Sequence, residues 1–393
     1  MADPSPITCP VCGSADLKLI YHSRTQTSLS SLCQVLPGAK LVSHCRECGH
    51  LIGNGVADAE SFYELEYRIL LDDEDEDQIY EVRDDKIVSR TDHQLSVFVE
   101  KLAPGPNLAV LDYGCAKAAM ARRLSEQYPG FDMHLFDVSQ MYEPFWDRLV
   151  SKHRQSVNET PAVWNGRFDL VTSYFAFEHI PDPKAAMAHV ERLLKPGGRF
   201  YMIVPDVFGN AADFIVIDHV HHFTQTSVNR LLADAGFASI AIDRQAHRGA
   251  LVVSATKYGA GEPDANDQDQ DRDDKATIMH QAEELATFWS SAAEAVKRNE
   301  RAAGTGKAAI YGSGFYGAFT HANLDRPEAV SCFLDQSPWR QGRTLFDVPI
   351  ISPTSLPEDV EAVHVGLNPV IARGIIETQR WVGGDRLHIG YLE

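Results

Sequence analysis

The chain has few cysteines and few basic residues for its length. Its 393 residues include seven cysteines, and 36 Lys and Arg against 55 Asp and Glu give a formal net charge of −19. Seven cysteines are too few for a disulfide-rich secreted scaffold. The charge disfavours a nucleic-acid partner, because binding phosphates requires a basic face and no stretch of the sequence supplies one.

Long apolar runs are also missing. No uninterrupted apolar stretch has membrane-spanning length, and the opening MADPSPITCP has neither a charged leader nor a hydrophobic core. We therefore expect a soluble cytoplasmic protein without a membrane partner. Two acidic runs, at 72–77 and 262–274, are predicted to be solvated connectors, because like charges repel and lack apolar partners.

Four of the cysteines form two C-x-x-C hooks, Cys9 and Cys12 in CPVC, and Cys45 and Cys48 in CREC. Two such hooks, brought together by hairpin strands, can complete a tetrahedral shell around one zinc ion. A closed shell of this kind is structural, since it leaves no open position for chemistry. Two disulfides are the alternative, and the reduced setting expected for this chain favours zinc.

Apolar strands alternate with helical segments between the two acidic runs. The helix after Asp182 is well marked, because Asp182 suits the N-cap and Pro183 the first helical position. Alternation at this spacing predicts a doubly wound α/β domain of parallel strands, with its ligand crevice at their carboxyl ends. The predicted strands are 108–112, 133–138, 168–175 and 199–205.

Three residues at those strand ends indicate a nucleoside ligand. Asp112 and Asp137 close the first two strands, where Asp137 can accept ribose hydroxyls, and Gly114 permits a close turn. Here the sequence resembles class I methyltransferases that use S-adenosylmethionine, whose usual loop is D-x-G-x-G-x-G. Ala116 and Ala118 stand at the second and third glycine positions. The alternative for the two aspartates is helix capping, which any doubly wound sheet can use.

The stretches FDLVTSYFAFEHIPDP (168–183) and LLKPGGRFYMIVPD (193–206) carry the more specific part of this resemblance. Cys115 lies inside the loop, and we expect its backbone rather than its thiol to contact the ligand, because sulfonium methyl transfer needs no covalent relay. The resemblance implies cofactor contacts at Asp112, Tyr113, Gly114, Cys115, Ala116, Asp137, Val138, Tyr174 and Phe175.

A histidine-rich segment follows the strand that ends at Pro205. Four residues, Asp218, His219, His221 and His222, lie within five consecutive positions. Imidazole exchanges a proton near neutral pH, so this cluster is a candidate general base. Two alternatives remain open: His219 braces the turn while Thr224 or Thr226 caps the following helix, or Asp218 and the histidines hold a metal ion.

The whole layout resembles the zinc-containing C-methyltransferases that act on nucleotide-linked deoxysugars. In that family a Y-H-E-H segment supplies the base from its last histidine, with the glutamate assisting. The resemblance places His219 at the base and Asp218 at the glutamate, whereas Val216 and Ile217 replace the tyrosine and the first histidine.

Further active-site residues follow from the same resemblance. The histidine of EHIP, His179, matches a family active-site histidine that stabilises an enolate, and Tyr63 or Tyr67 matches a tyrosine contributed from the ribbon side. The expected catalytic residues are His219, Asp218, His179, His222 and Tyr67.

The carboxy-terminal part carries a second glycine motif. KAAIYGSGFYG places Gly312, Gly314 and Gly317 as G-x-G-x-x-G after a strand, and VSCFLD ends in Asp335 at the distance of a ribose contact. This pattern alone permits a nicotinamide cofactor. The resemblance favours a Rossmann-like lobe that closes over the substrate, with Arg340 and Arg343 as candidate diphosphate contacts.

The predicted domains are a zinc-binding domain (1–71), a methyltransferase domain (78–258), an acidic linker (259–275) and a Rossmann-like lobe (276–393). The predicted activity is methyl transfer from S-adenosylmethionine to a small acceptor, above all C-methylation of a nucleotide-linked sugar. The alternatives are O- or N-methylation of another small metabolite, an inactive binding protein with this fold, and a nicotinamide enzyme.

Overall fold

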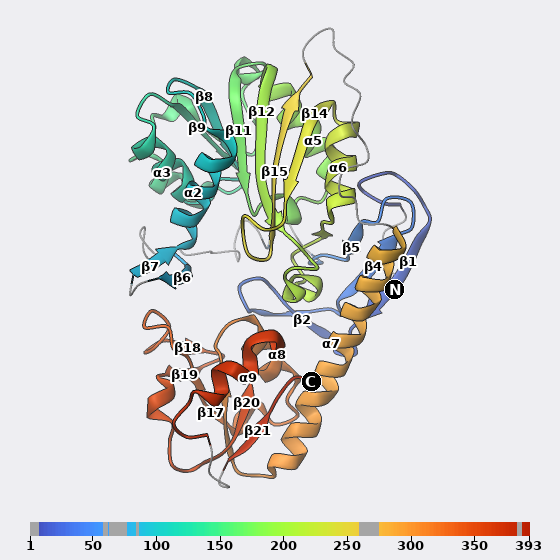
Figure 1. Cartoon of the computed structure of the whole chain (residues 1–393), viewed down its shortest axis with the longest axis vertical. Coiled ribbons are helices and arrows are strands. Elements are labelled where there is room, and N and C mark those ends of the chain that lie inside the picture. Colours follow the sequence, from blue (N-terminus) through green and yellow to red (C-terminus); the bar gives the residue numbers. More distant parts are fainter. Residues whose placement is uncertain (1–7, 58–61, 63–76, 84–85, 259–274, 383–386) are drawn as a thin grey trace. The chain divides into compact units, whose positions relative to one another are not determined.

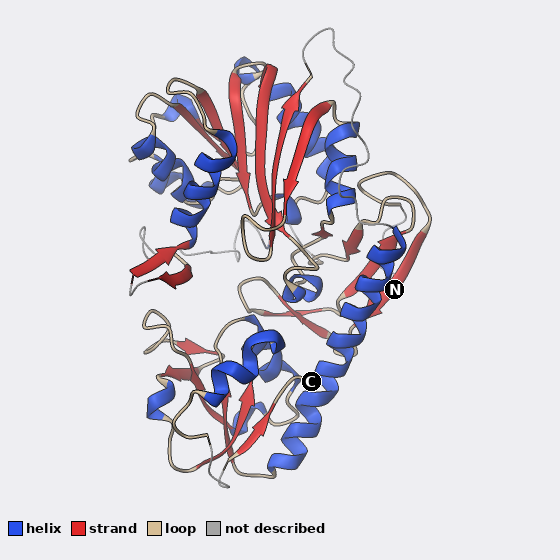
Figure 2. Cartoon of the chain, viewed as in Figure 1, coloured by secondary structure: helices blue, strands red, loops and turns tan. Residues whose placement is uncertain are grey.

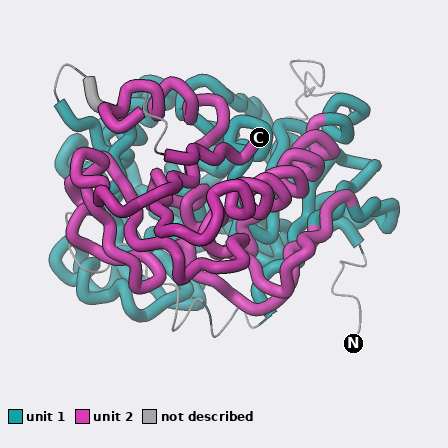
Figure 3. The backbone as a smooth tube through the Cα atoms, turned by 90° about the horizontal axis from the view of Figure 1, so that it is seen from below, with its two compact units in different colours: residues 1–19, 42–214, 218–280 teal, residues 20–41, 215–217, 281–393 magenta. Residues whose placement is uncertain are grey.

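The computed structural model describes residues 8–57, 62, 77–83, 86–258, 275–382 and 387–393. The chain divides into two compact units, residues 1–19, 42–214 and 218–280, and residues 20–41, 215–217 and 281–393 (Figure 3). The domain limits given above remain predictions. The acidic run at 72–77 and the linker at 259–275 lie outside the described residues, apart from Asp77 and Lys275.

The first unit is built on a seven-stranded sheet (Figure 1). Its strand order is β10-β9-β8-β11-β12-β15-β14, and only β15 runs antiparallel to its neighbours. This topology confirms the expected class I methyltransferase fold. The strands are β8 (Ala109–Tyr113), β9 (Asp132–Asp137), β10 (Gln155–Val157), β11 (Phe168–Tyr174), β12 (Leu194–Pro205), β14 (Phe237–Asp243) and β15 (Ala250–Lys257).

Helices cover both faces of this sheet, because successive strand residues point to opposite sides. Val110 packs with α2 and α3, whereas its neighbour Leu111 packs with α5 and α6. Figure 2 shows the resulting three layers, with strands between helices. The helices are α2 (Arg90–Leu102), α3 (Ala119–Gln127), α5 (Pro183–Leu193) and α6 (Gln225–Asp234).

Two of these helices begin at the caps that the sequence predicts. The Asp182 side chain accepts a hydrogen bond from the backbone N–H of Ala185, and Pro183 is the first helical residue. Thr224, one of the two candidates for its helix, forms a capping box with Ser227. Each cap satisfies a backbone donor that the first helical turn leaves open.

A small sheet joins the amino-terminal hooks to the histidine segment. Its order is β1-β4-β5-β13, and the antiparallel pair β5 and β13 aligns His221 with Ile52. The strands are β1 (Leu17–His22), β4 (Leu41–Cys45), β5 (Leu51–Gly53) and β13 (His221–His222). The last two residues of the histidine segment, His221 and His222, therefore form one strand of the ribbon's own sheet.

The second unit contains a six-stranded sheet of order β18-β19-β17-β16-β20-β21, parallel except for β18. This is the expected Rossmann-like lobe. Its strands are β16 (Lys307–Tyr311), β17 (Val330–Leu334), β18 (Thr344–Leu345), β19 (Val348–Ile351), β20 (Val360–Val365) and β21 (His388–Gly390). Its helices include α8 (Phe315–Asn323) and α9 (Pro369–Glu377), and α7 (Lys275–Ala303) leads into it. Among the described helices, none combines the length and apolar content that crossing a bilayer requires.

Candidate active site

The turn after β8 keeps the backbone path of a glycine loop although two of its three positions are alanine. Gly114 has φ +74°, and a Cβ there would lie 2.6 Å from the Ala176 Cβ. Ala116 and Ala118 also have positive φ, 45° and 60°. An L-residue in this conformation costs about 1–2 kcal/mol. The loop thus keeps two alanines at positive φ, a conformation that alanine disfavours. The sequence pattern alone does not predict this conformation.

Asp137 ties this turn to the end of β9. Its Oδ2 accepts a hydrogen bond from the backbone N–H of Ala116 at 2.8 Å, and its Oδ1 accepts one from Ser139 at 3.1 Å. The carboxylate therefore orders the loop, and each oxygen keeps further acceptor capacity for a ligand hydroxyl.

Asp112 lies beneath the same turn and is 2% exposed. Its Oδ1 accepts a hydrogen bond from the Thr172 hydroxyl at 3.3 Å. Burial raises the pKa of Asp112 to about 7; the Thr172 bond opposes this rise, and the charge of Asp137 adds to it. A carboxyl group that titrates near neutral pH inside a cleft is a common mark of a functional site.

These residues line a cavity of about 420 Å³ at the carboxyl ends of the parallel strands. Its volume lies within the roughly 300–1,000 Å³ that small-molecule pockets occupy. All nine residues predicted to contact the cofactor line it: Asp112, Tyr113, Gly114, Cys115, Ala116, Asp137, Val138, Tyr174 and Phe175. Cofactor binding by these residues remains a proposal.

The cavity also contains residues that the sequence analysis missed. Arg90 begins α2, and its guanidinium lies 3.6 Å from the ring centre of Phe175. Asn158 follows β10, the next strand end beyond Asp137. The strand-end rule that identified Asp112 and Asp137 did not reach Asn158, because the three-residue strand β10 was not predicted. Nothing in the sequence indicates the stacking of Arg90.

Asp213 holds the histidine segment. Its Oδ1 lies 2.5 Å from Nδ1 of His219, and its Oδ2 lies 2.7 Å from Nδ1 of His222. Burial lowers the pKa of His219, but the charge and hydrogen bond of Asp213 outweigh it, so the pKa is raised. Asp213 was absent from the predicted residues. Asp213 lies on the short helix Ala211–Ile215, and no local sequence motif indicates its role.

Asp218, predicted to orient His219, contacts His179. Nδ1 of His179 donates a hydrogen bond to the backbone carbonyl of Asp218 at 3.0 Å and lies 3.6 Å from its Oδ2. The Asp213 carboxylate hydrogen-bonds to His219, and the orientation of His219 by Asp218 remains a prediction. The rings of His179 and His219 meet edge to face with centres 4.7 Å apart.

His179 connects the histidine segment with the cavity, because it lines the cavity itself. Burial lowers the pKa of His179 to about 4, and the charge of His219 lowers it further. The preceding residue, Glu178, is 1% exposed, and its burial raises its pKa to about 7. Glu178 lies in the EHIPDP stretch but was not assigned a role. The two tyrosines predicted from the ribbon side, Tyr63 and Tyr67, lie outside the described residues.

The ribbon contacts the histidine segment through a second histidine pair. Nε2 of His221 lies 2.9 Å from the carbonyl of Ile180, and its Nδ1 lies 3.0 Å from Nε2 of His50. A carbonyl only accepts hydrogen bonds, so His221 carries its proton on Nε2 and its Nδ1 accepts from His50. His50 follows the second cysteine hook directly, so the hook positions this pair.

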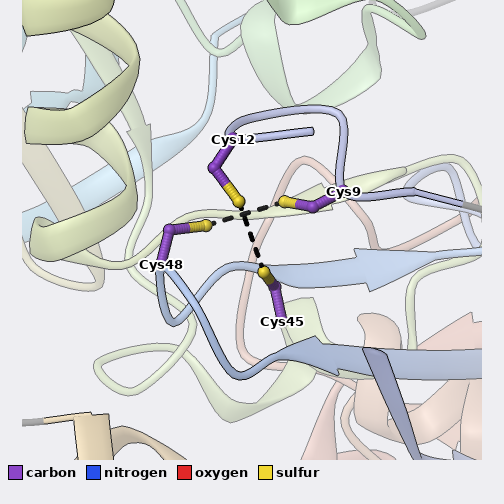
Figure 4. Close-up of side chains that lie close together, drawn as sticks. All are labelled: Cys9, Cys12, Cys45 and Cys48. Carbon is purple, nitrogen blue, oxygen red and sulfur yellow. Dashed lines mark hydrogen bonds between the residues drawn. The ribbon is translucent and has the colours of Figure 1, made fainter. Parts of the chain in front are cut away.

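The four hook cysteines converge on one point (Figure 4). The Sγ atoms of Cys9 and Cys48 are 3.6 Å apart, and those of Cys12 and Cys45 are 3.5 Å apart. A tetrahedral zinc ion with Zn–S bonds of about 2.3 Å separates its sulfurs by about 3.8 Å, while a disulfide requires about 2.05 Å. The cluster therefore fits a zinc ribbon and not two disulfides.

The glycine motif of the second unit serves packing. A Cβ on Gly317 would lie 1.9 Å from the carbonyl oxygen of Gly312. Asp335 accepts hydrogen bonds from the backbone N–H and hydroxyl of Ser313 at 3.0 and 2.6 Å. Arg340, a candidate diphosphate contact, donates to the Ser313 carbonyl at 2.6 Å. The loop thus binds its own neighbours, and Arg343 hydrogen-bonds through its backbone to Ile350.

Residues 87–242 match the family model described as a methyltransferase domain. Ubiquinone biosynthesis O-methyltransferase from Xanthomonas oryzae pv. oryzae is 35% identical over 98 residues, which cover 24% of this chain and 41% of that protein. Sarcosine/dimethylglycine N-methyltransferase from Halorhodospira halochloris is 26% identical over 211 residues, covering 49% of this chain and 72% of that protein. The chain thus spans less than half the length of the ubiquinone relatives that it matches.

Solved structures resemble the chain more distantly. An S-adenosylmethionine-dependent methyltransferase from Mesorhizobium loti is 18% identical with a TM-score of 0.34, covering 42% of this chain and 98% of that one. The complex of the Haloferax volcanii Trm112 methyltransferase activator with a methyltransferase is a second example. Its matching chain is 17% identical with a TM-score of 0.37, and the match covers 43% of this chain and 91% of that one. The strand order is that of the class I methyltransferase fold, and residues 87–242, which lie within this domain, match the methyltransferase family model.

Proposed function

We propose that the protein transfers a methyl group from S-adenosylmethionine to a small acceptor, and that the acceptor is a nucleotide-linked sugar methylated at carbon. One observation carries the proposal: the cavity expected to hold the cofactor is continuous with a histidine pair. His179 lines the cavity, and its ring centre lies 4.7 Å from that of His219. The proposed base therefore lies next to a residue that lines the cavity proposed for the methyl donor.

Within this proposal the loop 112–118 and Asp137 hold the cofactor. S-adenosylmethionine, when bound, supplies an electrophilic methyl group on a cationic sulfur. Asp112 and Asp137 contribute negative charge to the cavity, and Asp137 retains acceptor capacity for hydroxyl groups. The apolar side chains of Val138 and Phe175 add walls that exclude water.

His219 is the proposed base. The hydrogen bond from its Nδ1 to Asp213 fixes the tautomer with the lone pair on Nε2 and stabilises the imidazolium that forms when a proton arrives. His179, kept neutral by burial, is proposed to stabilise the enolate left by the acceptor. His222 shares Asp213 with His219 and is fully buried, so we assign it a positioning role.

The nucleotide-linked sugar rests on the resemblance of the full layout: cysteine hooks, methyltransferase domain and carboxy-terminal lobe in this order. O- or N-methylation of another small metabolite is the second candidate, and the names of the relatives favour it, since they include an O- and an N-methyltransferase. In that case His219 deprotonates a hydroxyl or an ammonium group.

A screen of sugar nucleotides with isotopically labelled methyl donor tests the activity. We expect one labelled methyl group in one acceptor, detected by mass spectrometry. Calorimetry with S-adenosylmethionine and its demethylated product is the companion measurement, because an inactive scaffold with a damaged loop binds neither at micromolar concentration. Absence of binding would refute the enzymatic proposal.

A variant pair tests the base. His219→Asn is expected to lower turnover by about 10²–10⁴-fold, the usual contribution of general base catalysis. His153→Asn is the matched control, since His153 is exposed and hydrogen-bonds to Ser151. Unchanged turnover of His219→Asn with the true acceptor removes His219 from this role. We further propose that the cysteine cluster holds structural zinc, and elemental analysis of the purified chain should give one ion per chain.

A further inference from the structure

A buried carboxylate beside the two histidines has no role in the mechanism above. Glu178 is 1% exposed, and its Oε2 has no hydrogen-bond partner within the described part of the chain. Buried carboxylates in proteins are paired, protonated or bound to a metal ion, because an unpartnered one forfeits its hydration. A bound cation would satisfy this carboxylate in its charged form.

His179 and His219 complete a triangle with Glu178. One potential ligand atom from each residue lies within 4.8 Å of the other two. An ion bound at about 2.0–2.2 Å from each atom would hold them about 3–3.5 Å apart.

Both imidazoles make a hydrogen bond of the kind that supports metal-binding histidines. Nδ1 of His219 is bound to the Asp213 carboxylate at 2.5 Å, and Nδ1 of His179 donates to the Asp218 carbonyl at 3.0 Å. Metal-binding histidines usually donate their other ring nitrogen to a carboxylate or carbonyl, which fixes the ring and leaves the Nε2 lone pair for the ion.

We propose that Glu178, His179 and His219 form a binding site for one first-row divalent metal ion, separate from the four-cysteine cluster. Two imidazoles and one carboxylate suit Zn²⁺, Co²⁺ and related ions, and three protein ligands leave an open position for water or another ligand. His179 also lines the cofactor cavity, so the open position lies beside that cavity.

The site has a consequence for the proposed base. An ion bound to His219 takes the lone pair that would otherwise accept a proton, so metal binding and base function exclude each other. A divalent ion therefore inhibits methyl transfer. This consequence rests on the proposed function, whereas the site itself does not.

Cobalt titration of the purified full chain, with zinc in the cysteine cluster, tests the site. We expect one Co²⁺ per chain by equilibrium dialysis, with visible d–d bands and no thiolate-to-cobalt charge-transfer band. Glu178→Gln should weaken binding at least tenfold, and Asp213→Asn, which removes the support of His219, by about 10–100-fold. Glu191→Gln is the control, because Glu191 lies on α5 and pairs with Lys257 of β15, so this variant should bind cobalt as the wild type does.

Three results would overturn the site: no cobalt bound by the wild type at millimolar concentration, cobalt bound only with the thiolate band, or equal affinity in Glu178→Gln and the wild type. Should a variant fail to fold, as judged by circular dichroism, the wild-type stoichiometry alone decides. Methyl transfer is measured separately, so cobalt binding without any activity refutes the proposed function and leaves the site intact.

Discussion

Asp213 and His219 form a buried pair, with Oδ1 of the carboxylate 2.5 Å from Nδ1 of the imidazole. The same carboxylate binds His222 through its other oxygen. Asp213 thus hydrogen-bonds to two histidines of the segment 218–222, whose last two residues form strand β13 of the ribbon sheet.

Asp213→Asn should destabilise the protein strongly. Burial raises the pKa of Asp213, but the charges of His222 and His219 outweigh it and hold the pKa well below its usual range. Removing one partner of a buried pair costs about 3–5 kcal/mol, measurable by urea denaturation. In the wild type this contribution is fully present above the unfolded pKa, near 3.8, and is lost as the pH falls below it.

Asp234→Asn is the control for that measurement. Asp234 pairs with Arg230 one helical turn away, and both side chains are more than a third exposed. Solvent screens such pairs, so the expected loss is below about 0.5 kcal/mol. Equal losses for the two variants would contradict the assignment of Asp213 as a central support.

Ala116→Gly and Ala118→Gly should each stabilise the protein by about 1 kcal/mol, since glycine adopts positive φ without the Cβ penalty. Ala121→Gly is the matched control. Ala121 lies inside α3, where glycine costs about 1 kcal/mol. Thermal denaturation of the three variants should therefore show two increases and one decrease; a decrease for all three would mean that the loop is not strained.

Cofactor affinity should rise as the pH increases through about 7. Asp112, with its pKa raised to about 7, is protonated below that pH and carries a negative charge above it. A cationic ligand binds the charged form better, so calorimetry should give tighter binding of S-adenosylmethionine at pH 8 than at pH 6. Asp112→Asn should remove this dependence, and a pH dependence that survives the substitution would assign it to another group.

Removal of zinc should unfold the ribbon and loosen the histidine segment. Cys9, Cys45 and Cys48 belong to the same core as Phe177 and Phe223, and β5 pairs directly with β13. The binding free energy of a structural metal adds to the free energy of folding. A chelator, or Cys45→Ala, should lower the melting temperature together with the zinc content. Cys33→Ser lies outside the cluster and should leave both unchanged.

Gly317→Ala should destabilise the second unit by about 1–3 kcal/mol, because its Cβ would lie 1.9 Å from the Gly312 carbonyl oxygen. Gly314→Ala should be tolerated, since nothing lies within 4 Å of a Cβ there and its φ is −88°. Chemical denaturation distinguishes the two. A fully stable Gly317→Ala would contradict the packing role of this motif.

Much of the fold followed from local patterns. Apolar runs of strand length predicted β8, β9, β11 and β12, with bounds that differ from the structure by a few residues. Asp182 and Pro183 predicted the start of α5. The cysteine hooks predicted the ribbon, because two C-x-x-C turns have the ligand spacing of a zinc site. Burial periodicity and capping are properties of neighbouring residues, so a sequence displays them directly.

The hydrogen-bond partners of the site histidines could not be predicted from local sequence patterns. Asp218 stands next to His219 in the chain, yet the carboxylate bonded to His219 is Asp213, six residues away across a short helix and a turn. His50 and His221 meet although 171 positions separate them. Such pairings depend on how strands align, and no local spacing encodes them.

By itself the sequence determined the class of the domain, the strand ends that bear Asp112 and Asp137, and the four-cysteine cluster, because periodicity, turn chemistry and ligand spacing are written in adjacent residues. Only the tertiary structure decided that two alanines keep the left-handed turns of a glycine loop, that Asp213 supports the histidines, and that Glu178 lies with them in one buried triangle. The physical reason is that hydrogen bonds and backbone strain arise from the packing of distant segments, which fixes geometry that the residues alone leave free.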